Sequence, residues 1–424
     1  MQTYLYPPRV QWNELIARPT QNQTALFGTV QTVLDAVKSL GDEAVKAYEL
    51  QFDKVALTDL EVPPEDRARG AKQVPEPLKR ALLIAASNIL KFHGAQRQDT
   101  LPCVETAEGV VCWQKAVPIE KVGLYVPGGT APLFTTVLML GIPAAIAGCK
   151  EVILCTPPDA EGNIHPAILF AAELARVSRI FKIGGSQAIA AMAYGTESVP
   201  KVYKIFGPGN QYVTAAKQLV SLSDVAIDMP AGPSEVEVVA DDSANPTFVA
   251  ADLLSQAEHG ADSQVLLVTT SEKLAKAVES EIEKQIVKVP RAELARKALK
   301  NSRIIVLSTA DEIVELTNLY APEHLILETA NYKTIAERIT NAGSVFMGHY
   351  TPESAGDYAT GTNHTLPTNG HARAYSGVNL DSFLKKITFQ EISQEGIREL
   401  GTTIEVLAET EQLMAHKNAV TVRL

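Results

Sequence analysis

Gln256 and His259 combine residue types and a spacing that suit metal chemistry. They lie three positions apart near the end of an amphipathic helical pattern that starts at Pro246, so both side chains leave one face of the helix. Gly260 then acts as a helix-terminating residue. An imidazole nitrogen and an amide oxygen can each bind a metal ion. The same pattern is also typical of a polar helix end in solvent, so other segments of the chain must distinguish a metal site from this alternative.

Glu323 and His324 offer acid–base chemistry. They follow Pro322 and begin a short expected strand. A carboxylate beside an imidazole supplies two proton acceptors whose pKa values can be brought close to neutral pH. Neighbouring residues of a strand point to opposite faces, so the two can share a cleft only at a strand edge or at a kink after the proline. The alternative is a solvated glutamate next to a packed histidine.

Asp357 completes the candidate chemistry together with three later residues. Asp357 lies in a glycine-flanked loop, where a carboxylate either binds a divalent cation or caps its own backbone, and His364 has the same ambiguity. Glu411 and His416 are five positions apart on an expected helix, about 140° around its axis. Four of these residues form a nitrogen and oxygen set that suits Zn²⁺, with Mn²⁺ or Co²⁺ as substitutes: Gln256, His259, Asp357 and His416. Their convergence cannot be read from the sequence.

The elements that must position these residues alternate between strands and helices from residue 122 onward. The first series has expected strands at 122–126, 151–155, 180–183 and 202–206, with helices at 133–147, 166–177, 187–194 and 212–220. The second series has strands at 236–240, 264–269, 303–307, 324–327 and 344–347, with helices at 248–257 and 272–300. Such alternation predicts right-handed crossovers and parallel sheets.

Three loops of the first series are rich in glycine and follow expected strands. They are Pro127-Gly128-Gly129-Thr130, Gly184-Gly185-Ser186-Gln187 and Gly207-Pro208-Gly209-Asn210. Bare backbone N–H groups and helix N-termini at the carboxyl ends of parallel strands favour phosphates and dinucleotides. Tight strand-to-helix turns need glycine as well, so both interpretations stay open. The chain contains neither Gly-x-Gly-x-x-Gly nor a Walker phosphate loop.

The fold class predicted from these patterns is α/β, with two Rossmann-like parallel-sheet domains and a helical C-terminal segment. Helices at 30–52 and 77–96 are expected to pack on the second sheet, and the chain from residue 384 is expected to be helical with one apolar face for a partner. The predicted division is an N-terminal arm (1–20), a discontinuous domain with most of the site (21–121 and 234–380), an inserted dinucleotide-binding domain (122–233) and a C-terminal dimerisation segment (381–424).

Composition narrows the class of protein. The chain has 424 residues, 46% of them hydrophobic and 21% charged, with a net charge of −11. No basic run suggests a nucleic-acid surface, and no run of eighteen apolar residues suggests a membrane span. The N-terminus lacks the pattern of a secretory signal, and the four cysteines show no Cys-x-x-Cys spacing. We therefore expect a cytoplasmic protein with reduced, buried thiols and no nucleic-acid or membrane partner.

Seven motifs of the chain resemble those of histidinol dehydrogenases. The resemblance as a whole runs in order over most of the chain, from about residue 30 to the end. The motifs are LYVPGGTAPL (124–133), GPGN (207–210), DMPAGPSE (228–235), LLSQAEHG (253–260), APEHL (321–325), GDYATGTNH (356–364) and AHKNAV (415–420). Motifs of this length and specificity do not match by chance.

The resemblance implies an enzyme that oxidises L-histidinol through L-histidinaldehyde to L-histidine with two NAD⁺. It implies Glu323 and His324 as the acid–base pair and one Zn²⁺ per subunit. It also implies an intertwined homodimer in which C-terminal residues complete the partner's site. By position, the implied zinc ligands are Gln256, His259, Asp357 and His416, the implied NAD⁺ contacts are Tyr125, Gln187 and Asn210, and the implied substrate contacts are Ser234, Gln256, His259, His324, Asp357, Glu411 and His416.

The same residues also allow other functional interpretations. A zinc hydrolase would also use a metal, a glutamate and a histidine, but the His-Glu-x-x-His motif of zinc proteases is absent. A two-lobed solute-binding protein would normally carry an export signal. A catalytically inactive relative would share the fold, although the polar set is intact here. Within the family resemblance, the alternative is a zinc-dependent dehydrogenase of a related amino alcohol.

Overall fold

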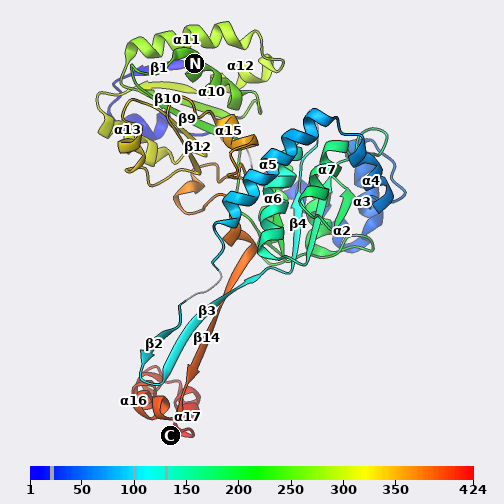
Figure 1. Cartoon of the computed structure of the whole chain (residues 1–424), viewed down its shortest axis with the longest axis vertical. Coiled ribbons are helices and arrows are strands. Elements are labelled where there is room, and N and C mark those ends of the chain that lie inside the picture. The colour runs from blue at the N-terminus through cyan, green and yellow to red at the C-terminus, as the bar shows by residue number, and fades with distance from the viewer. Residues whose placement is uncertain (20–22, 99–101, 129–131) are drawn as a thin grey trace.

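Two parallel β-sheets form the body of the molecule (Figure 1). The computed structural model describes residues 1–19, 23–98, 102–128 and 132–424. The six-stranded sheet has the order β1 (Gln2–Leu5), β11 (Arg303–Val306), β10 (Gln264–Thr269), β9 (Glu235–Ala240), β12 (His324–Glu328) and β13 (Ser344–Met347). The five-stranded sheet has the order β6 (Arg179–Lys182), β5 (Glu151–Thr156), β4 (Lys121–Tyr125), β7 (Lys204–Phe206) and β8 (Ala226–Ile227). The predicted α/β class with parallel sheets is confirmed.

The five-stranded sheet is buried on both faces, and the apolar residues of its strands supply both cores. One face packs against α5 (Glu76–Gly94), α6 (Phe134–Ala147) and α7 (Pro166–Leu174), and α4 (Pro64–Lys72) packs on α7. The other packs against α2 (Gln23–Leu40), α3 (Asp42–Tyr48), α8 (Gly185–Tyr194) and α9 (Gln211–Ser221). Successive strand residues such as Ile153 and Leu154 alternate between these two cores.

The early helices therefore pack on the five-stranded sheet, and our prediction that they cover the second sheet was wrong. Val30, Leu34 and Val37 of α2 join the core that contains Phe181 and Ile189. The helical pattern correctly indicated an apolar face, but such a face carries no information about which of two apolar sheets it covers. Sequence order gave no guidance, because these helices precede both sheets.

The six-stranded sheet is also covered on both faces. α10 (Pro246–Ala257), α11 (Glu272–Ile286) and α12 (Ala292–Lys300) lie on one face, so the long expected helix at 272–300 is two helices. α1 (Trp12–Leu15), α13 (Ala310–Tyr320) and α14 (Tyr332–Ala336) lie on the other. The start of the N-terminal arm is an edge strand, since β1 pairs in parallel with β11.

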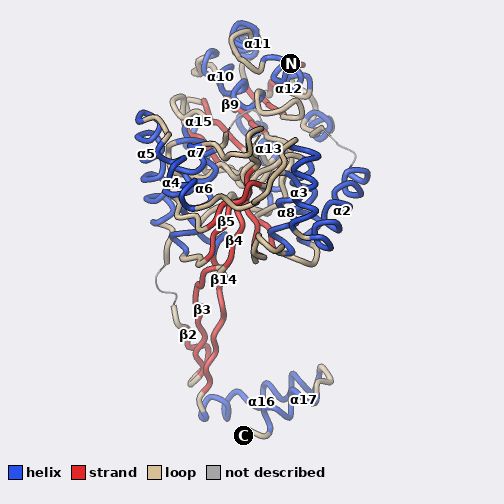
Figure 2. Tube along the Cα trace, turned by 90° about the vertical axis from the view of Figure 1, so that its right-hand side faces the viewer, coloured by secondary structure: helices blue, strands red, loops and turns tan. Residues whose placement is uncertain are grey.

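A long antiparallel ribbon carries the C-terminus away from the body (Figures 1 and 2). β14 (Leu384–Ile392) pairs along its whole length with β3 (Val110–Pro118), and β2 (Val104–Ala107) pairs with β3. The predicted helix at the start of this segment was wrong. The alternation of Ile387 and Phe389 with polar residues, which is a strand period, had been overlooked. The helices that follow, α16 (Gln394–Thr410) and α17 (Met414–Thr421), lie at the far end of the ribbon.

The remaining elements are short. They are α15 (Glu353–Tyr358), the 3-10 turns at Arg9–Gln11, His371–Arg373 and Leu380–Phe383, and a π-helical turn, η2 (Glu49–Asp53). No helix of the described residues is long and apolar enough to cross a membrane. All four cysteines are free thiols, but only Cys155 is fully buried and Cys103 is exposed, so the expectation of buried thiols holds for part of the set.

Candidate active site

The candidate catalytic residues lie at the amino ends of strands in the six-stranded sheet. His324 is the first residue of β12 and pairs with Val236 of β9, which starts at Glu235. α10 runs back from the carboxyl edge after β9, so its last turn delivers Gln256 to this same amino edge. The helix ends at Ala257, three residues before the glycine expected to stop it, and His259 lies just beyond its end.

The Glu323 and His324 side chains lie close together, although neighbouring residues of a regular strand point to opposite faces. Glu323 Oε2 lies 3.6 Å from His324 Nδ1 and accepts a hydrogen bond of 2.9 Å from the backbone N–H of Glu235. The turn before them uses Ala321 at a φ of 54°, a left-handed conformation that ends α13 and redirects the chain. Both side chains are buried, with 6% and 3% exposure.

Several buried ligand atoms at this edge have no hydrogen-bond partner among the described residues. They are His324 Nε2, Asp357 Oδ1, Gln256 Oε1 and Glu353 Oε2. Asp357 Oδ1 is 3.5 Å from His324 Nε2, and Gln256 Nε2 is 3.2 Å from His324 Nδ1. Buried polar atoms are normally paired, so a group of unpaired nitrogen and oxygen atoms fits a divalent cation.

Glu353 is a site residue that the sequence analysis missed. His324, Glu353 and Asp357 each offer a ligand atom within 4.8 Å of the others. Glu353 is the first residue of α15 and Asp357 lies one turn later, so the two carboxylates share a helix face. The spacing Glu-x-x-x-Asp was visible in the sequence, but the segment was interpreted as a loop.

Charge in the site is set by burial and by close neighbours. Burial acts to lower the pKa of His324, but the Glu353 and Glu323 carboxylates raise it well above its usual range. Burial raises the pKa of Glu353 to about 8. Burial also acts to raise the pKa of Asp357, but the adjacent His324 imidazole reverses this and leaves the pKa lowered. Perturbed groups of this kind gather at functional sites.

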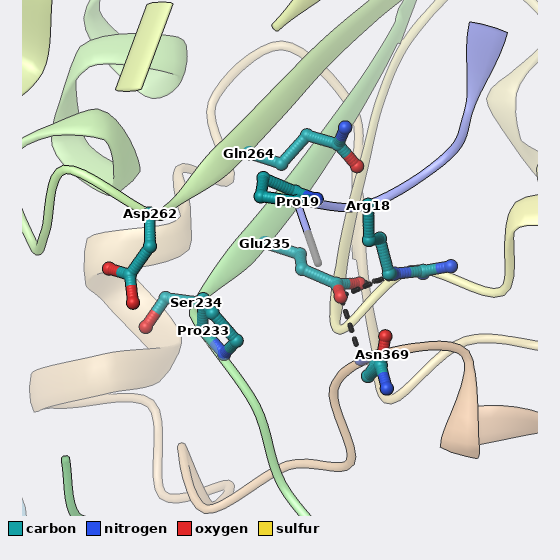
Figure 3. Close-up of a pocket in the computed structure, with 8 residues that line it drawn as sticks. All are labelled: Arg18, Pro19, Pro233, Ser234, Glu235, Asp262, Gln264 and Asn369. Atoms are coloured by element: carbon teal, nitrogen blue, oxygen red, sulfur yellow. Dashed lines mark hydrogen bonds and ion pairs between the residues drawn. The ribbon is translucent and has the colours of Figure 1, made fainter. Parts of the chain in front are cut away.

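Three further predicted or ambiguous residues lie around this centre. His259 is exposed at its rim; partial burial of its ring lowers its pKa, and the Asp357 carboxylate opposes that shift. Both ring nitrogens of His364 have a hydrogen-bond partner. Nδ1 lies 3.1 Å from the Asp357 carbonyl oxygen, and Nε2 lies 2.9 Å from Thr136 Oγ1. Ser234 lines a small pocket beside Glu235 (Figure 3).

The contact between His364 and Thr136 connects the two sheets. Thr136 lies in the first turn of α6, which follows β4 at the carboxyl edge of the five-stranded sheet. Asn363 also donates a 2.6 Å hydrogen bond to the carbonyl of Met139 in the same helix. The carboxyl edge of the five-stranded sheet therefore faces the amino edge of the six-stranded sheet.

Two of the three predicted cofactor residues meet at that carboxyl edge. The Tyr125 hydroxyl accepts a 3.1 Å hydrogen bond from the backbone N–H of Gly185, next to the buried Gln187. Glu49 of η2, which the sequence analysis missed, accepts from Gln187 Nε2 at 2.8 Å and from the N–H of Gly184 at 3.0 Å. Burial raises the pKa of Glu49 to about 7.

The third residue, Asn210, has a visible structural role. Its side chain caps α9 by accepting from the backbone N–H groups of Tyr212 and Val213 at 3.0 and 3.1 Å, and the residue is exposed. Lys217 holds the preceding loop in place. Its ammonium group donates a 2.8 Å hydrogen bond to the Gly207 carbonyl and forms an ion pair with Asp228. In the first glycine loop, residues 129–131 lie outside the described residues.

Glu411 and His416 do not join the other site residues within one chain. Both are exposed at the far end of the ribbon, away from β12 and α15 (Figures 1 and 2). We had expected the two residues to lie on one helix, and this was wrong. Glu411 caps the end of α16, Gln412 has a φ of 62°, and His416 lies in α17.

The chain is similar to known proteins along nearly its whole length. The family model described as histidinol dehydrogenase matches residues 16–424. The histidinol dehydrogenase of Bacteroides thetaiotaomicron is 66% identical over 100% of this chain and 99% of its own length. That of Escherichia coli K12 is 52% identical over 98% of this chain and 95% of its own. The crystal structure of histidinol dehydrogenase from Elizabethkingia anophelis superposes with a TM-score of 0.97 at 56% identity, covering 100% and 98% of the two chains. The chain therefore belongs to the histidinol dehydrogenase family and is an oxidoreductase.

Proposed function

We propose that this protein oxidises L-histidinol to L-histidine in two NAD⁺-dependent steps, with L-histidinaldehyde between them and one zinc ion per subunit. The observation that carries the proposal is the group of unpaired buried atoms on Gln256, His324 and Asp357 beside the Glu323 carboxylate. This group faces the glycine loops of the other sheet through the contact between Thr136 and His364.

The metal would be held by Gln256, His259 and Asp357 together with His416 of the partner subunit. Bound there, Zn²⁺ would supply the positive charge that anchors the imidazole and amino nitrogens of histidinol. The donor set supports this choice, because it combines imidazole nitrogen with carboxylate and amide oxygens and contains no thiolate. Ser234, His324 and Glu411 of the partner subunit would contact the substrate around this anchor.

In the first step, His324 accepts the proton of the histidinol hydroxyl while the carbinol carbon loses a hydride to NAD⁺. The products are histidinaldehyde, NADH and a proton held on His324. The imidazole is buried and fixed by Glu323, Gln256 and the Glu235 carbonyl, at 3.2 to 3.6 Å. The charge of Zn²⁺ bound beside it would offset the carboxylates that raise its pKa, and would so favour the neutral form that accepts a proton.

In the second step, Glu323 accepts a proton from a water molecule that attacks the aldehyde, and His324 returns its proton to the carbonyl oxygen, giving the hydrate. His324 then accepts a hydroxyl proton from the hydrate as a second hydride leaves to a second NAD⁺. This yields the carboxylic acid, which ionises to the carboxylate, and the protons on Glu323 and His324 pass to solvent. Both NAD⁺ molecules would bind at Tyr125, Gln187 and Asn210. Helix N-termini at that edge favour the pyrophosphate.

A homodimer would complete each site in trans. α16 and α17 expose Val406, Leu407, Leu413 and Met414 at the far end of the ribbon, which supports burial against a second subunit. Mixing His416→Ala with His324→Ala subunits tests this. Heterodimers then contain one intact site, so about a quarter of wild-type activity should return on statistical mixing. If the two inactive variants remain inactive after verified subunit exchange, the site is not shared.

The test of the function itself is NADH formation at 340 nm from L-histidinol, before and after chelation. Two NADH per histidinol, lost on chelation and restored by Zn²⁺, are expected. One NADH per histidinol would remove the second oxidation. Faster turnover of another amino alcohol would favour the alternative, a zinc-dependent dehydrogenase of a related substrate.

A further inference from the structure

Arg18 at the end of the N-terminal arm reaches the amino edge of the six-stranded sheet. Its guanidinium forms a two-pronged ion pair with Glu235, with Nε–Oε1 at 2.5 Å and Nη2–Oε2 at 2.8 Å (Figure 3). The guanidinium also donates a 2.9 Å hydrogen bond to the Tyr320 carbonyl, and its central carbon lies 4.1 Å from the centre of the Tyr320 ring. This planar, bidentate geometry belongs to arginine and cannot be reproduced by lysine.

Glu235 is the residue whose backbone touches all three central side chains of the site. Its N–H donates to Glu323 Oε2 at 2.9 Å. Its carbonyl lies 3.1 Å from Gln256 Nε2, which donates to it, and 3.2 Å from His324 Nδ1. One peptide segment at the start of β9 therefore orients the proposed water-activating base, the proposed proton acceptor and one proposed metal ligand.

The side chain of Glu235 is held by a different set of groups from its backbone. Arg18 holds both of its oxygens, and the backbone N–H of Asn369 donates 2.6 Å to Oε1. The side chain is 2% exposed, so without Arg18 a carboxylate would be buried close to Glu323 with its charge unbalanced. The segment would then have reason to move, and its backbone contacts would move with it.

We propose that Arg18 is a positioning residue for catalysis, which acts through Glu235 to hold the backbone that orients Glu323, His324 and Gln256. The proposal rests on the roles given above to Glu323 and His324. Arg18 itself touches none of these three side chains. Its effect should be largest on Glu323, because that carboxylate is held directly by the Glu235 N–H.

The test compares Arg18→Gln and Arg18→Lys with wild type in separate assays of histidinol oxidation and histidinaldehyde oxidation. A misplacement of about 1 Å costs roughly 100-fold, so we expect Arg18→Gln to slow aldehyde oxidation 10- to 100-fold. The rate of histidinol oxidation should also fall, by a factor about three times smaller than that for aldehyde oxidation, and KM for NAD⁺ should not change. Arg18→Lys should lie between, because it keeps the charge and loses the fork. If Arg18→Gln does not fold, Arg18→Lys carries the test.

Arg9→Gln is the matched control from the same arm. Arg9 forms an exposed 2.6 Å ion pair with Glu315 and should leave both reactions unchanged. A purely structural role for Arg18 would lower both oxidations equally, in proportion to the folded fraction, and would overturn the proposal. If Glu323→Gln slows aldehyde oxidation selectively and Arg18→Gln does not, the positioning role fails alone. If wild type oxidises no histidinol, the proposed function has failed first.

Discussion

The two parallel sheets of this protein place the residues for which we propose functions at opposite edges. In the five-stranded sheet, Tyr125, Gln187 and Asn210 lie at or beyond the carboxyl ends of strands. In the six-stranded sheet, Glu323 and His324 lie at the amino end of β12, and Gln256 reaches the same edge from the end of α10. Ligands of open parallel sheets usually bind at the carboxyl edge, so the six-stranded sheet departs from the rule that the five-stranded sheet follows.

The difference matches the sign of the charge that each edge would bind. Helices α6, α8 and α9 start at the carboxyl edge of the five-stranded sheet, and their N-termini carry partial positive charge that suits phosphates. α10 ends at the amino edge of the six-stranded sheet, and its C-terminus carries partial negative charge that suits a cation. Because the two edges face each other, a dinucleotide and a metal-anchored substrate would meet between them.

Removing a carboxylate from the amino edge should have the largest effect. We expect Asp357→Asn to lower kcat about 10³-fold, equivalent to roughly 4 kcal/mol, because it removes a proposed metal ligand. Metal content of the purified protein is the second readout and should fall in parallel. Asp241→Asn is the control, since Asp241 lies at the other edge of the same sheet and accepts from the Ala330 N–H. Full metal content with normal turnover in Asp357→Asn would place the metal elsewhere.

Glu323→Gln should separate the two chemical steps. The amide oxygen can still accept from the Glu235 N–H, but the side chain cannot accept a proton from water. We expect oxidation of histidinaldehyde to slow about 10²-fold while oxidation of histidinol changes by less than a few-fold. Rapid-mixing assays of each half-reaction measure this. Equal losses in both steps would show that Glu323 does not act specifically on water.

Changes at the carboxyl edge should alter cofactor binding and leave the chemistry intact. We expect Gln187→Ala to raise KM for NAD⁺ about ten-fold, the cost of a lost hydrogen bond, with kcat and metal content unchanged. Gln31→Ala is the control, because Gln31 is exposed on α2 and bonds only to Asp35 in the described residues. A fall in kcat at saturating NAD⁺ would mean that the two edges are not functionally separate.

Glu49 should have the smallest effect on activity, and its change should be visible in stability and in the pH dependence of stability. Its folded pKa of about 7 lies above the usual 4.5, so its contribution to stability is complete below pH 4.5 and is lost as the pH rises through 7. The loss amounts to roughly 3 kcal/mol in wild type. Glu49→Gln does not titrate, so urea unfolding should show its stability improving relative to wild type between about pH 5 and pH 8. Parallel stability curves would contradict this.

Local periodicity predicted much of the secondary structure. The strand at 264–269 matches in full, and most other strands agree within one or two residues. Errors arose where local pattern lacks the deciding information. The apolar face of α2 could cover either sheet, and Glu49 stands 138 positions from Gln187, so spacing could not associate the two. Spacing could have associated Glu353 with Asp357, but it could not associate either with His324.

The sequence by itself determined the alternation of strands and helices, the glycine loops and the family motifs, because these depend on neighbours a few positions apart. Only the tertiary structure decided which edge of each sheet carries the site, that Glu235 and Arg18 stand behind Glu323, and that Glu411 and His416 lie far from His324 in one chain. These depend on contacts such as that of Arg18 with Glu235, 217 positions apart, which packing creates and local periodicity does not encode.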